Sequence, residues 1–285
     1  MPAEALSPSR AGDFMQCPLL YRFRVIDRLP EAPSPAAVRG TVVHAVLERI
    51  FDLPAQQRTR AAARSLLPPQ WARIQQESPE LADLFDGDDA DAERARWLSG
   101  AEELLDRWFD LEDPTRLEPA DRELYVETTL DGGLTLRGYV DRIDVAADGR
   151  VRVVDYKTGR APSETFEGKA LFQMKFYGLV LWRLRGAVPA LLQLVYLGSG
   201  DVLRYVPDEA DLRATERKVT ALWAAITRAA RSGDWRASPG RLCDWCDHRA
   251  LCPAWGGTPP PLPADAGDRV AGAVSVPRAP DRNGD

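Results

Sequence analysis

The sequence predicts a mixed α/β core with a helical insertion before its sheet. Five segments have the pattern of strands: residues 123–130, 134–145, 150–156, 190–197 and 202–206. Two glycine-containing hairpin signals, at 131–133 and 147–149, separate the first three strands. A helical pattern at 166–185 precedes the last two strands, and another at 208–231 follows them. This alternation of helices and strands is typical of mixed α/β proteins.

The chain before the sheet is predicted to be mainly helical. Ser7 has the position of an N-cap for a short helix that ends at Gln16. A proline-rich linker at 29–35 leads to a strongly apolar helix at 36–51. Residues 57–112 have the pattern of several helices, with breaks expected at Pro68-Pro69, at Pro79 and at the turn 86–89.

These elements predict a single domain over residues 1–255. Its helical insertion covers about 54–118, and a cysteine-rich region covers about 240–253. With 45% hydrophobic residues, the chain can bury a sizeable core. The tail at 256–285 is predicted to be disordered, because it consists of Pro, Gly, Ala and Asp with almost no large apolar residue.

Composition limits the classes of protein to consider. No apolar run approaches the ~18 residues that span a bilayer, and the N-terminus lacks a secretory pattern, so a cytoplasmic protein is expected. The net charge is −6, but residues 77–131 alone carry 19 acidic and 5 basic side chains. We interpret this stretch as a solvated helical face. The rest of the chain is net basic, so a nucleic-acid partner is not excluded.

Carboxylates and one lysine gather at the ends of two predicted strands. Asp155 and Lys157 lie two residues apart and therefore share one face of a strand. A three-residue loop at 147–149 would place Asp141 opposite Asp155, whereas a two-residue loop would turn Asp141 to the other face. Two opposed carboxylates need a cation between them, and oxygen ligands suit Mg²⁺ or Mn²⁺. The alternative is an ordinary surface ion pair between Asp155 and Lys157.

Three further polar residues lie on predicted helices. His44 follows the inward stripe of the helix at 36–51, so it is either a satisfied core histidine or a third ligand beside two carboxylates. Gly40, one turn earlier, would allow another backbone to approach closely. Gln173 and Tyr177 are four residues apart and share one helix face, from which both could position a substrate phosphate.

The four cysteines predict a metal or cluster site. Cys243, Cys246 and Cys252 form the pattern C-x2-C-x5-C. Zinc could be bound by these three thiols together with His248, whereas an iron–sulfur cluster needs a fourth thiolate, for which Cys17 is the one remaining cysteine. The second choice would close a loop of more than two hundred residues and constrain the unfolded chain strongly.

In this order, the motifs resemble the RecB-like branch of the PD-(D/E)XK nucleases, close to single-domain exonucleases and AddB-type nuclease domains with a 4Fe–4S cluster. The resemblance rests on His44, Gly-x-x-Asp141, Asp155-Tyr156-Lys157 and Gln173-x3-Tyr177, between Cys17 and the C-x2-C-x5-C segment. It covers about residues 6–253. Val140 departs from the family pattern, because the superfamily name has proline at this position.

The resemblance implies a restriction-endonuclease-like core and a metal-dependent DNA exonuclease of repair or recombination. Its Mg²⁺ or Mn²⁺ would be held by His44, Asp141, Asp155 and the Tyr156 carbonyl, and Lys157 would position the water. Gln173 and Tyr177 would organise the catalytic site and substrate. The four cysteines, Cys17, Cys243, Cys246 and Cys252, would hold a structural 4Fe–4S cluster.

Two other functions remain open from the sequence. A catalytically inactive DNA-binding or scaffold module would keep the same fold and cluster, although the presence of Asp141, Asp155 and Lys157 argues against it. An iron–sulfur electron carrier would leave the nuclease-like strands unexplained. The chain has no G-x-x-x-x-G-K-[ST] segment, so a helicase activity would have to come from a separate chain.

Overall fold

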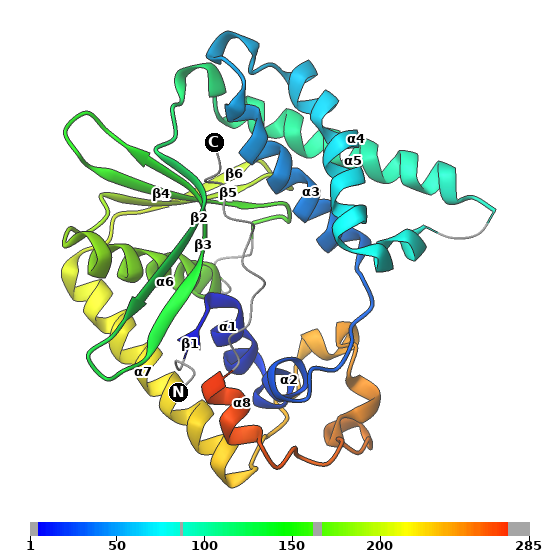
Figure 1. The fold of residues 1–285 in the computed structure, drawn as a ribbon, viewed down its shortest axis with the longest axis vertical. Coiled ribbons are helices and arrows are strands. Elements are labelled where there is room, and N and C mark those ends of the chain that lie inside the picture. The colour runs from blue at the N-terminus through cyan, green and yellow to red at the C-terminus, as the bar shows by residue number, and fades with distance from the viewer. Residues whose placement is uncertain (1–4, 86–87, 162–166, 273–285) are drawn as a thin grey trace, which may run out of the picture. The chain divides into compact units, whose positions relative to one another are not determined.

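The computed structural model describes residues 5–85, 88–161 and 167–272, and the chain divides into two compact units (Figure 1). Unit 1 comprises residues 1–31, 127–138 and 213–285, and unit 2 comprises residues 32–126 and 139–212. Unit 1 is assembled from three separate segments. One boundary, between residues 31 and 32, falls in the proline-rich linker, and the other three fall within β2, β3 and α7, which run continuously across them.

Unit 2 is built on a sheet in which β3, β4, β5 and β6 are neighbours in this order, and β2 pairs with β3. The strands are β2 (Asp121–Thr129), β3 (Thr135–Val145), β4 (Val151–Lys157), β5 (Leu191–Tyr196) and β6 (Asp201–Tyr205). β4 and β5 are parallel because α6 (Glu167–Arg185) connects them, whereas the β3–β4 and β5–β6 pairs are antiparallel. The five predicted strands are therefore confirmed, with ends that differ by one or two residues.

The turn between β3 and β4 sets the register on which the predicted site depends. Gly149 has a φ of +83°, and the Ala146 N–H donates to the Arg150 carbonyl at 2.9 Å. The three-residue loop at 147–149 is thus confirmed. This loop sets the register in which Arg142 pairs with Val154. One position further along the two strands, Asp141 lies opposite Asp155, as predicted.

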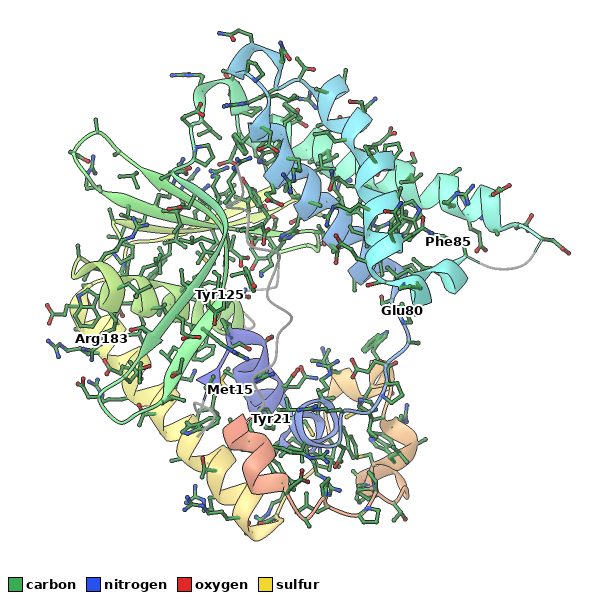
Figure 2. All side chains as sticks on the ribbon, in the orientation of Figure 1. Met15, Tyr21, Glu80, Phe85, Tyr125 and Arg183 are labelled. Carbon is green, nitrogen blue, oxygen red and sulfur yellow. The ribbon has the colours of Figure 1, made fainter. Side chains whose placement is uncertain are left out.

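Three long helices of unit 2 pack together: α3 (Pro35–Arg49), α4 (Arg60–Glu77) and α5 (Ala90–Leu111). Their shared core includes a cluster of aromatic rings in which Trp71 lies 4.9 Å and Phe85 lies 5.4 Å from Trp97, measured between ring centroids. Phe85 is labelled in Figure 2. Val154 and Tyr156 of β4 belong to the same core. The helices therefore pack against the strand that carries the predicted Asp-Tyr-Lys motif.

The expectation that Pro68-Pro69 breaks a helix is wrong. α4 runs through both prolines, and Leu67 and Trp71 on either side of them are buried. Each proline removes a backbone hydrogen bond, but tertiary packing of the apolar face supplies most helical stability in proteins. The acidic α5 is paired with α4, since Arg60 contacts Asp110 at 2.5 Å.

Unit 1 contains short elements from both ends of the chain. They are β1 (Ala5–Leu6), α1 (Pro8–Gln16), α2 (Pro18–Tyr21), most of α7 (Glu209–Ser232), three 3₁₀ turns between Arg241 and Trp255, and α8 (Ala266–Gly272). Ser7 caps α1 as predicted, because its side chain accepts from the Arg10 N–H at 3.3 Å. Tyr21 stacks on Trp235 with ring centroids 6.0 Å apart (Figure 2). β1 pairs in parallel with the start of β3 and is too short to be predicted from its sequence.

The segment after Gly256 differs from the predicted disordered tail. Residues 266–272 form α8, in which Ala266 and Val270 are buried. Arg269 donates to the Ile26 carbonyl at 2.9 Å, so a polar contact supplements the small apolar face. Residues 273–285 lie outside the described part of the chain. Every helix within the described ranges is too short or too polar to cross a membrane.

Candidate metal centre

The imidazole of His44 lies between two carboxylates of unit 2. Its Nδ1 atom is 3.5 Å from Asp141 Oδ2 and 3.8 Å from Glu123 Oε1. Burial lowers the pKa of His44, but the two carboxylates outweigh this effect and raise the pKa to about 8. α3 thus brings the predicted histidine to the predicted aspartate of β3.

Asp141 is held by the neighbouring strand. The backbone N–H of Tyr156 donates to its Oδ2 atom at 2.7 Å, and 13% of the side chain is exposed. Burial, together with the nearby charges of Asp155 and Glu123, raises the pKa of Asp141 to about 7 against the opposing effect of His44. This accumulation of negative charge in a buried position favours a bound cation.

Glu123 is a site residue that the sequence does not predict. Its φ is +45°, which is strained for a residue with a side chain. The turn at 131–133 between β2 and β3 sets a register in which Ala120 would lie opposite Asp144. The Ala120 N–H donates instead to the Ile143 carbonyl, at 2.8 Å. This one-residue offset is a β-bulge, a feature that redirects side chains near functional sites. Glu123 lies in a long acidic stretch, where no local pattern distinguishes it.

His44, Glu123 and Asp141 form a compact group of ligand atoms. One atom of each lies within 4.8 Å of the others, and no other group of three or more His, Cys, Asp or Glu residues in the described ranges meets this spacing. One nitrogen and two carboxylate oxygens are suitable donors for Mn²⁺ or Mg²⁺. The donor set therefore fits the expected metal, although its third member is Glu123 instead of Asp155.

Asp155 belongs to an adjacent triangle with Lys157 and Gln173. Lys157 Nζ lies 2.6 Å from Asp155 Oδ2 and donates to Gln173 Oε1 at 3.0 Å. Gln173 Nε2 donates to Asp155 Oδ1 at 3.0 Å. Asp155 is 2% exposed, and its Oδ2 has this ion pair but no hydrogen bond of normal geometry. A buried carboxylate oxygen in this state retains lone pairs for a cation.

Tyr177 completes the predicted set of side chains. It lies one turn after Gln173 on α6 and is 6% exposed. Burial raises the pKa of its hydroxyl, and the charges of Asp155 and Asp141 raise the pKa further. Tyr177 is therefore a neutral hydroxyl close to both aspartates.

The side chain of Tyr156 is anchored on the face of the sheet opposite to that of Asp155 and Lys157. Its hydroxyl bonds to Arg142 and donates to Glu112 Oε2 at 3.3 Å. Arg142 and Glu112 form a buried ion pair at 2.7 Å, and Trp108 Nε1 donates to Glu112 at 2.8 Å. This network fixes the residue between Asp155 and Lys157, and no local pattern in the chain predicts it, because its members come from three distant segments.

The strand end after Lys157 is closely packed. A Cβ atom on Gly40 would lie 3.2 Å from Thr158 Oγ1, so the glycine on α3 admits the residue that follows Lys157. A Cβ atom on Gly198 would lie 2.5 Å from the backbone of Gly159. Gly198 is therefore required by close approach of the backbone, whereas at Gly40 the Thr158 side chain would have to shift slightly.

The four cysteines all lie in unit 1 and form no disulfide. Burial raises the pKa of Cys246, and the proximity of the other three thiols raises it further. Backbone N–H groups donate to Cys17 Sγ at 3.4 Å and to Cys243 Sγ at 3.3 Å. No three of the sulfurs meet the 4.8 Å spacing found in the His44 group, so a compact site for a single ion is not formed in the described ranges.

His248 lies within the cysteine segment but is paired elsewhere. Its Nε2 atom is 2.9 Å from Glu31 Oε1, and its ring packs edge-on against Phe23. The side chain is 3% exposed. These contacts compete with the role of zinc ligand that the sequence leaves open for His248.

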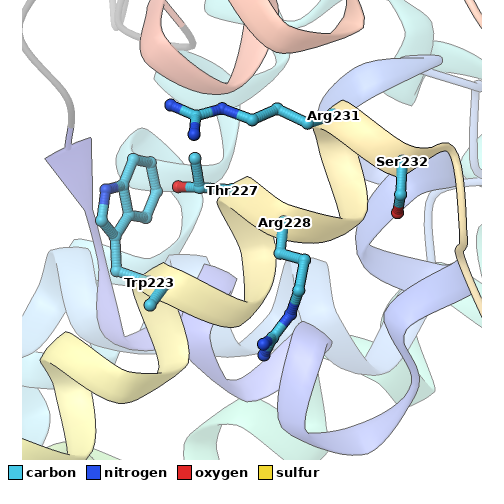
Figure 3. A pocket seen from close by; sticks show the side chains of 6 residues that line it. Trp223, Thr227, Arg228, Arg231 and Ser232 are labelled. Carbon is cyan, nitrogen blue, oxygen red and sulfur yellow. The ribbon is translucent and has the colours of Figure 1, made fainter.

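A hollow of about 630 Å³ lies along α7 in unit 1 (Figure 3). It is lined by Trp223, Ala224, Thr227, Arg228, Arg231 and Ser232. None of the predicted site residues lines this hollow, so it is separate from the group around His44.

Comparisons with known proteins agree with this geometry. A family model described as the PD-(D/E)XK nuclease superfamily matches residues 5–253. The Gene 69 protein of Mycobacterium phage D29 is 29% identical over 56% of this chain and 65% of its own length, and that of phage L5 is 23% identical over 87% and 96%. The chain spans less than two thirds of the D29 protein.

Two further relatives have names that refer to nucleases. An ATP-dependent helicase/deoxyribonuclease component of Streptococcus equi subsp. zooepidemicus is 31% identical over 45% of this chain, which spans 12% of that protein. The crystal structure of a proposed exonuclease from Eubacterium rectale superposes with a TM-score of 0.55 at 16% identity, over 86% of this chain and 88% of that one. At 16% identity, the similarity to the Eubacterium rectale structure shows a shared fold only.

Proposed function

The chain belongs to the PD-(D/E)XK nuclease superfamily, and on this premise we propose that it is a metal-dependent DNA exonuclease of repair or recombination. Its substrate would be single-stranded DNA or DNA ends. The observation that carries the proposal is the placement of the His44, Glu123 and Asp141 group directly beside the Asp155–Lys157–Gln173 triangle. A cation site can activate water and polarise the phosphate, and a fixed amine can stabilise the charge that develops, so the two together suit hydrolysis of a phosphodiester.

His44, Glu123 and Asp141 would hold Mg²⁺ or Mn²⁺, with Asp155 and the Tyr156 carbonyl as further ligands. The bound cation would supply a more acidic water and polarise a phosphoryl oxygen. Lys157 stabilises negative charge that develops on the phosphate or orients the attacking water. Gln173 and Asp155 hold its ammonium in place, and Tyr177 offers a neutral hydroxyl to the substrate.

We also propose a 4Fe–4S cluster at Cys17, Cys243, Cys246 and Cys252. Each thiolate of such a cluster binds a different iron, so the four sulfurs must lie farther apart than the ligand atoms of a single ion. The presence of all four cysteines in unit 1 and the N–H groups of Ser238 and Gly240 directed at Cys17 and Cys243 support this assignment. The pairing of His248 with Glu31 favours the all-cysteine ligand set over zinc. The cluster would be structural.

A helicase is a proposed partner of this nuclease. The described helices and strands contain no phosphate-binding loop of the G-x-x-x-x-G-K-[ST] type, and the full sequence has none. The name of the streptococcal relative associates that protein with a helicase, and this supports a similar partnership here.

The proposed activity is tested with purified protein on 5′- and 3′-labelled single-stranded and duplex DNA, with Mg²⁺, Mn²⁺ or EDTA. We expect metal-dependent cleavage that Asp155→Ala and Lys157→Met each reduce by at least about 100-fold, as loss of a charge-stabilising group typically does. A Mn²⁺ titration in parallel reports whether Lys157→Met still binds the cation.

Lys175→Met is the matched control. Lys175 lies on α6 two residues from Gln173, but its ammonium pairs with Asp211 at 3.2 Å. This variant should cleave like the unchanged protein. Cleavage that persists in both Asp155→Ala and Lys157→Met would contradict the proposed site, and absence of cleavage in the unchanged protein would favour an inactive DNA-binding module.

A further inference from the structure

Two tyrosines lie exposed on adjacent strands beside the metal group. Tyr125 of β2 is 43% exposed and Tyr139 of β3 is 39% exposed, which places them among the few exposed large apolar side chains of the described residues. Their ring centroids are 5.3 Å apart, with an angle of 57° between the ring planes. They therefore form one aromatic surface, and we call it the tyrosine pair (Tyr125 is labelled in Figure 2).

The tyrosine pair occupies the position next to the carboxylates on the same two strands. Tyr139 precedes Asp141 by two residues on β3, so these two side chains share a strand face. Tyr125 follows Glu123 by two residues on β2, but the bulge at Glu123 interrupts the alternation, so the side of Tyr125 is given by its contact with Tyr139. Contact between the rings confirms that both point to one side. Two residues along a strand correspond to about 7 Å. This distance is about two base steps of a stacked strand.

We propose that the tyrosine pair is a base-stacking platform for single-stranded nucleic acid, one or two nucleotides from the cleaved phosphodiester. The proposal rests on the proposed function, since it places the scissile phosphate at the His44 group. Aromatic rings bind the faces of unpaired bases without regard to sequence, and such stacking is the usual contact of proteins with single strands. In a duplex, neighbouring base pairs cover these faces, so the platform would favour single strands.

The chemistry of the two residues favours this ligand over a general apolar partner. Tyrosine combines an apolar ring with a polar hydroxyl, which suits a surface that is exposed in the free protein. The adjacent group of carboxylates and imidazole is polar and suited to a cation, so an apolar protein surface would not continue across it. A nucleic acid strand presents bases to the rings and phosphates to the bound cation within one or two nucleotides.

The test measures binding of a fluorescein-labelled oligothymidylate by anisotropy, in EDTA so that no cleavage occurs. We expect Tyr139→Ala and Tyr125→Ala each to raise Kd by about 5- to 150-fold, the range for loss of one base–aromatic stack. Tyr139→Phe and Tyr125→Phe keep the ring and should bind almost as tightly as the unchanged protein. Val145→Ala is the matched control, because Val145 lies on the same strand and is also 43% exposed.

A second measurement removes the base instead of the ring. Oligonucleotides with one abasic position, moved stepwise along the strand, should bind more weakly at one or two positions. At those positions, Tyr139→Ala should cause no further loss, because the two changes remove the same stack. Melting temperatures of all variants show that each remains folded at the temperature of the binding measurement.

Equal binding by the unchanged protein and both Ala variants would overturn the proposal, as would Phe variants that lose as much affinity as the Ala variants. A protein that forms an oligomer dissolved by Tyr139→Ala, with unchanged oligonucleotide affinity, would identify the rings as a protein interface and also overturn it. If the unchanged protein cleaves DNA and the Ala variants bind normally, the platform fails and the proposed function stands. If the unchanged protein does not cleave DNA but the Ala variants lose binding, the proposed function fails and the platform stands.

Discussion

The backbone N–H of Tyr156 holds Asp141 Oδ2 at 2.7 Å, so the middle residue of the Asp-Tyr-Lys motif positions a carboxylate on the neighbouring strand. The same residue bonds through its hydroxyl to Arg142 and Glu112 on the other face of the sheet. Tyr156 therefore links the proposed metal centre to a buried ionic network. Changes in that network should reach the centre through one residue.

Glu123→Gln is expected to weaken Mn²⁺ binding by about 10- to 100-fold, the range found for loss of a group that supports a metal site. The amide keeps the size of the side chain but removes the charge that faces His44. Isothermal titration calorimetry measures the affinity. Glu127→Gln on the same strand serves as the control. Equal affinity in Glu123→Gln and the unchanged protein would remove Glu123 from the centre.

Glu112→Gln is expected to lower the free energy of unfolding by up to about 3–5 kcal/mol, because the buried Arg142 guanidinium loses its bidentate partner and keeps only Asp144 at 3.2 Å. Urea denaturation measures this change. Glu77→Gln is the control, since Glu77 pairs with Arg73 at 2.6 Å and both of these side chains are exposed. A similarly small effect in both variants would show that the buried pair does not stabilise the fold.

The same ion pair predicts a dependence of stability on pH. Burial tends to raise the pKa of Glu112, but the hydrogen bonds and charge of Arg142 outweigh it, so its pKa lies below the usual value of 4.5. A carboxyl with a lowered pKa in the folded state stabilises fully above its unfolded pKa and loses this contribution as pH falls. We expect the unfolding free energy of the unchanged protein to fall more steeply below pH 4.5 than that of Glu112→Gln. Parallel curves would contradict this.

Gly198→Ala is expected to destabilise the protein by about 1–3 kcal/mol, the usual cost of overpacking, and to reduce cleavage. Its new Cβ atom would lie 2.5 Å from the backbone of Gly159, two residues after Lys157. Gly132→Ala is the control, because no atom lies within 4 Å of the position that its new methyl group would occupy. Thermal melts of the two variants check the difference, and an unshifted melt for Gly198→Ala would show that the loop yields freely.

Cys17→Ser is expected to abolish the brown colour and the iron and acid-labile sulfide of anaerobically purified protein. His248→Ala should retain all three, because His248 pairs with Glu31 and is not a ligand in the proposed cluster. Metal analysis distinguishes the alternatives. A colourless protein with stoichiometric zinc that His248→Ala loses would establish the zinc site instead.

The strands, the long helices and the 147–149 turn could be predicted because their signals are local. Alternation, glycine at the turn and the Ser-Pro start of α1 each act within a few residues. Glu123 could not be predicted, since its role depends on a bulge and on a backbone conformation that its sequence does not encode. The continuity of α4 through Pro68-Pro69 also depends on tertiary packing, which outweighs a local penalty.

In the candidate site, too, residues placed by local spacing could be predicted and residues placed by long-range contacts could not. Asp155 and Lys157 could be placed on one strand face by spacing alone, and the hairpin turn extended this to Asp141. The presence of Glu123 in the compact group could not be predicted, because it depends on the bulge in β2 and on the approach of His44 from α3. The division into two units is equally non-local, since unit 1 combines three distant segments.

The assembly of unit 1 from both ends of the chain has a consequence for biosynthesis. Cys17 leaves the ribosome more than two hundred residues before Cys243, Cys246 and Cys252. A nascent chain that stops at residue 240 would already contain every side chain around His44 but a single thiol. Insertion of the proposed cluster would therefore have to follow the synthesis of Cys252, after every residue around His44 has already been made.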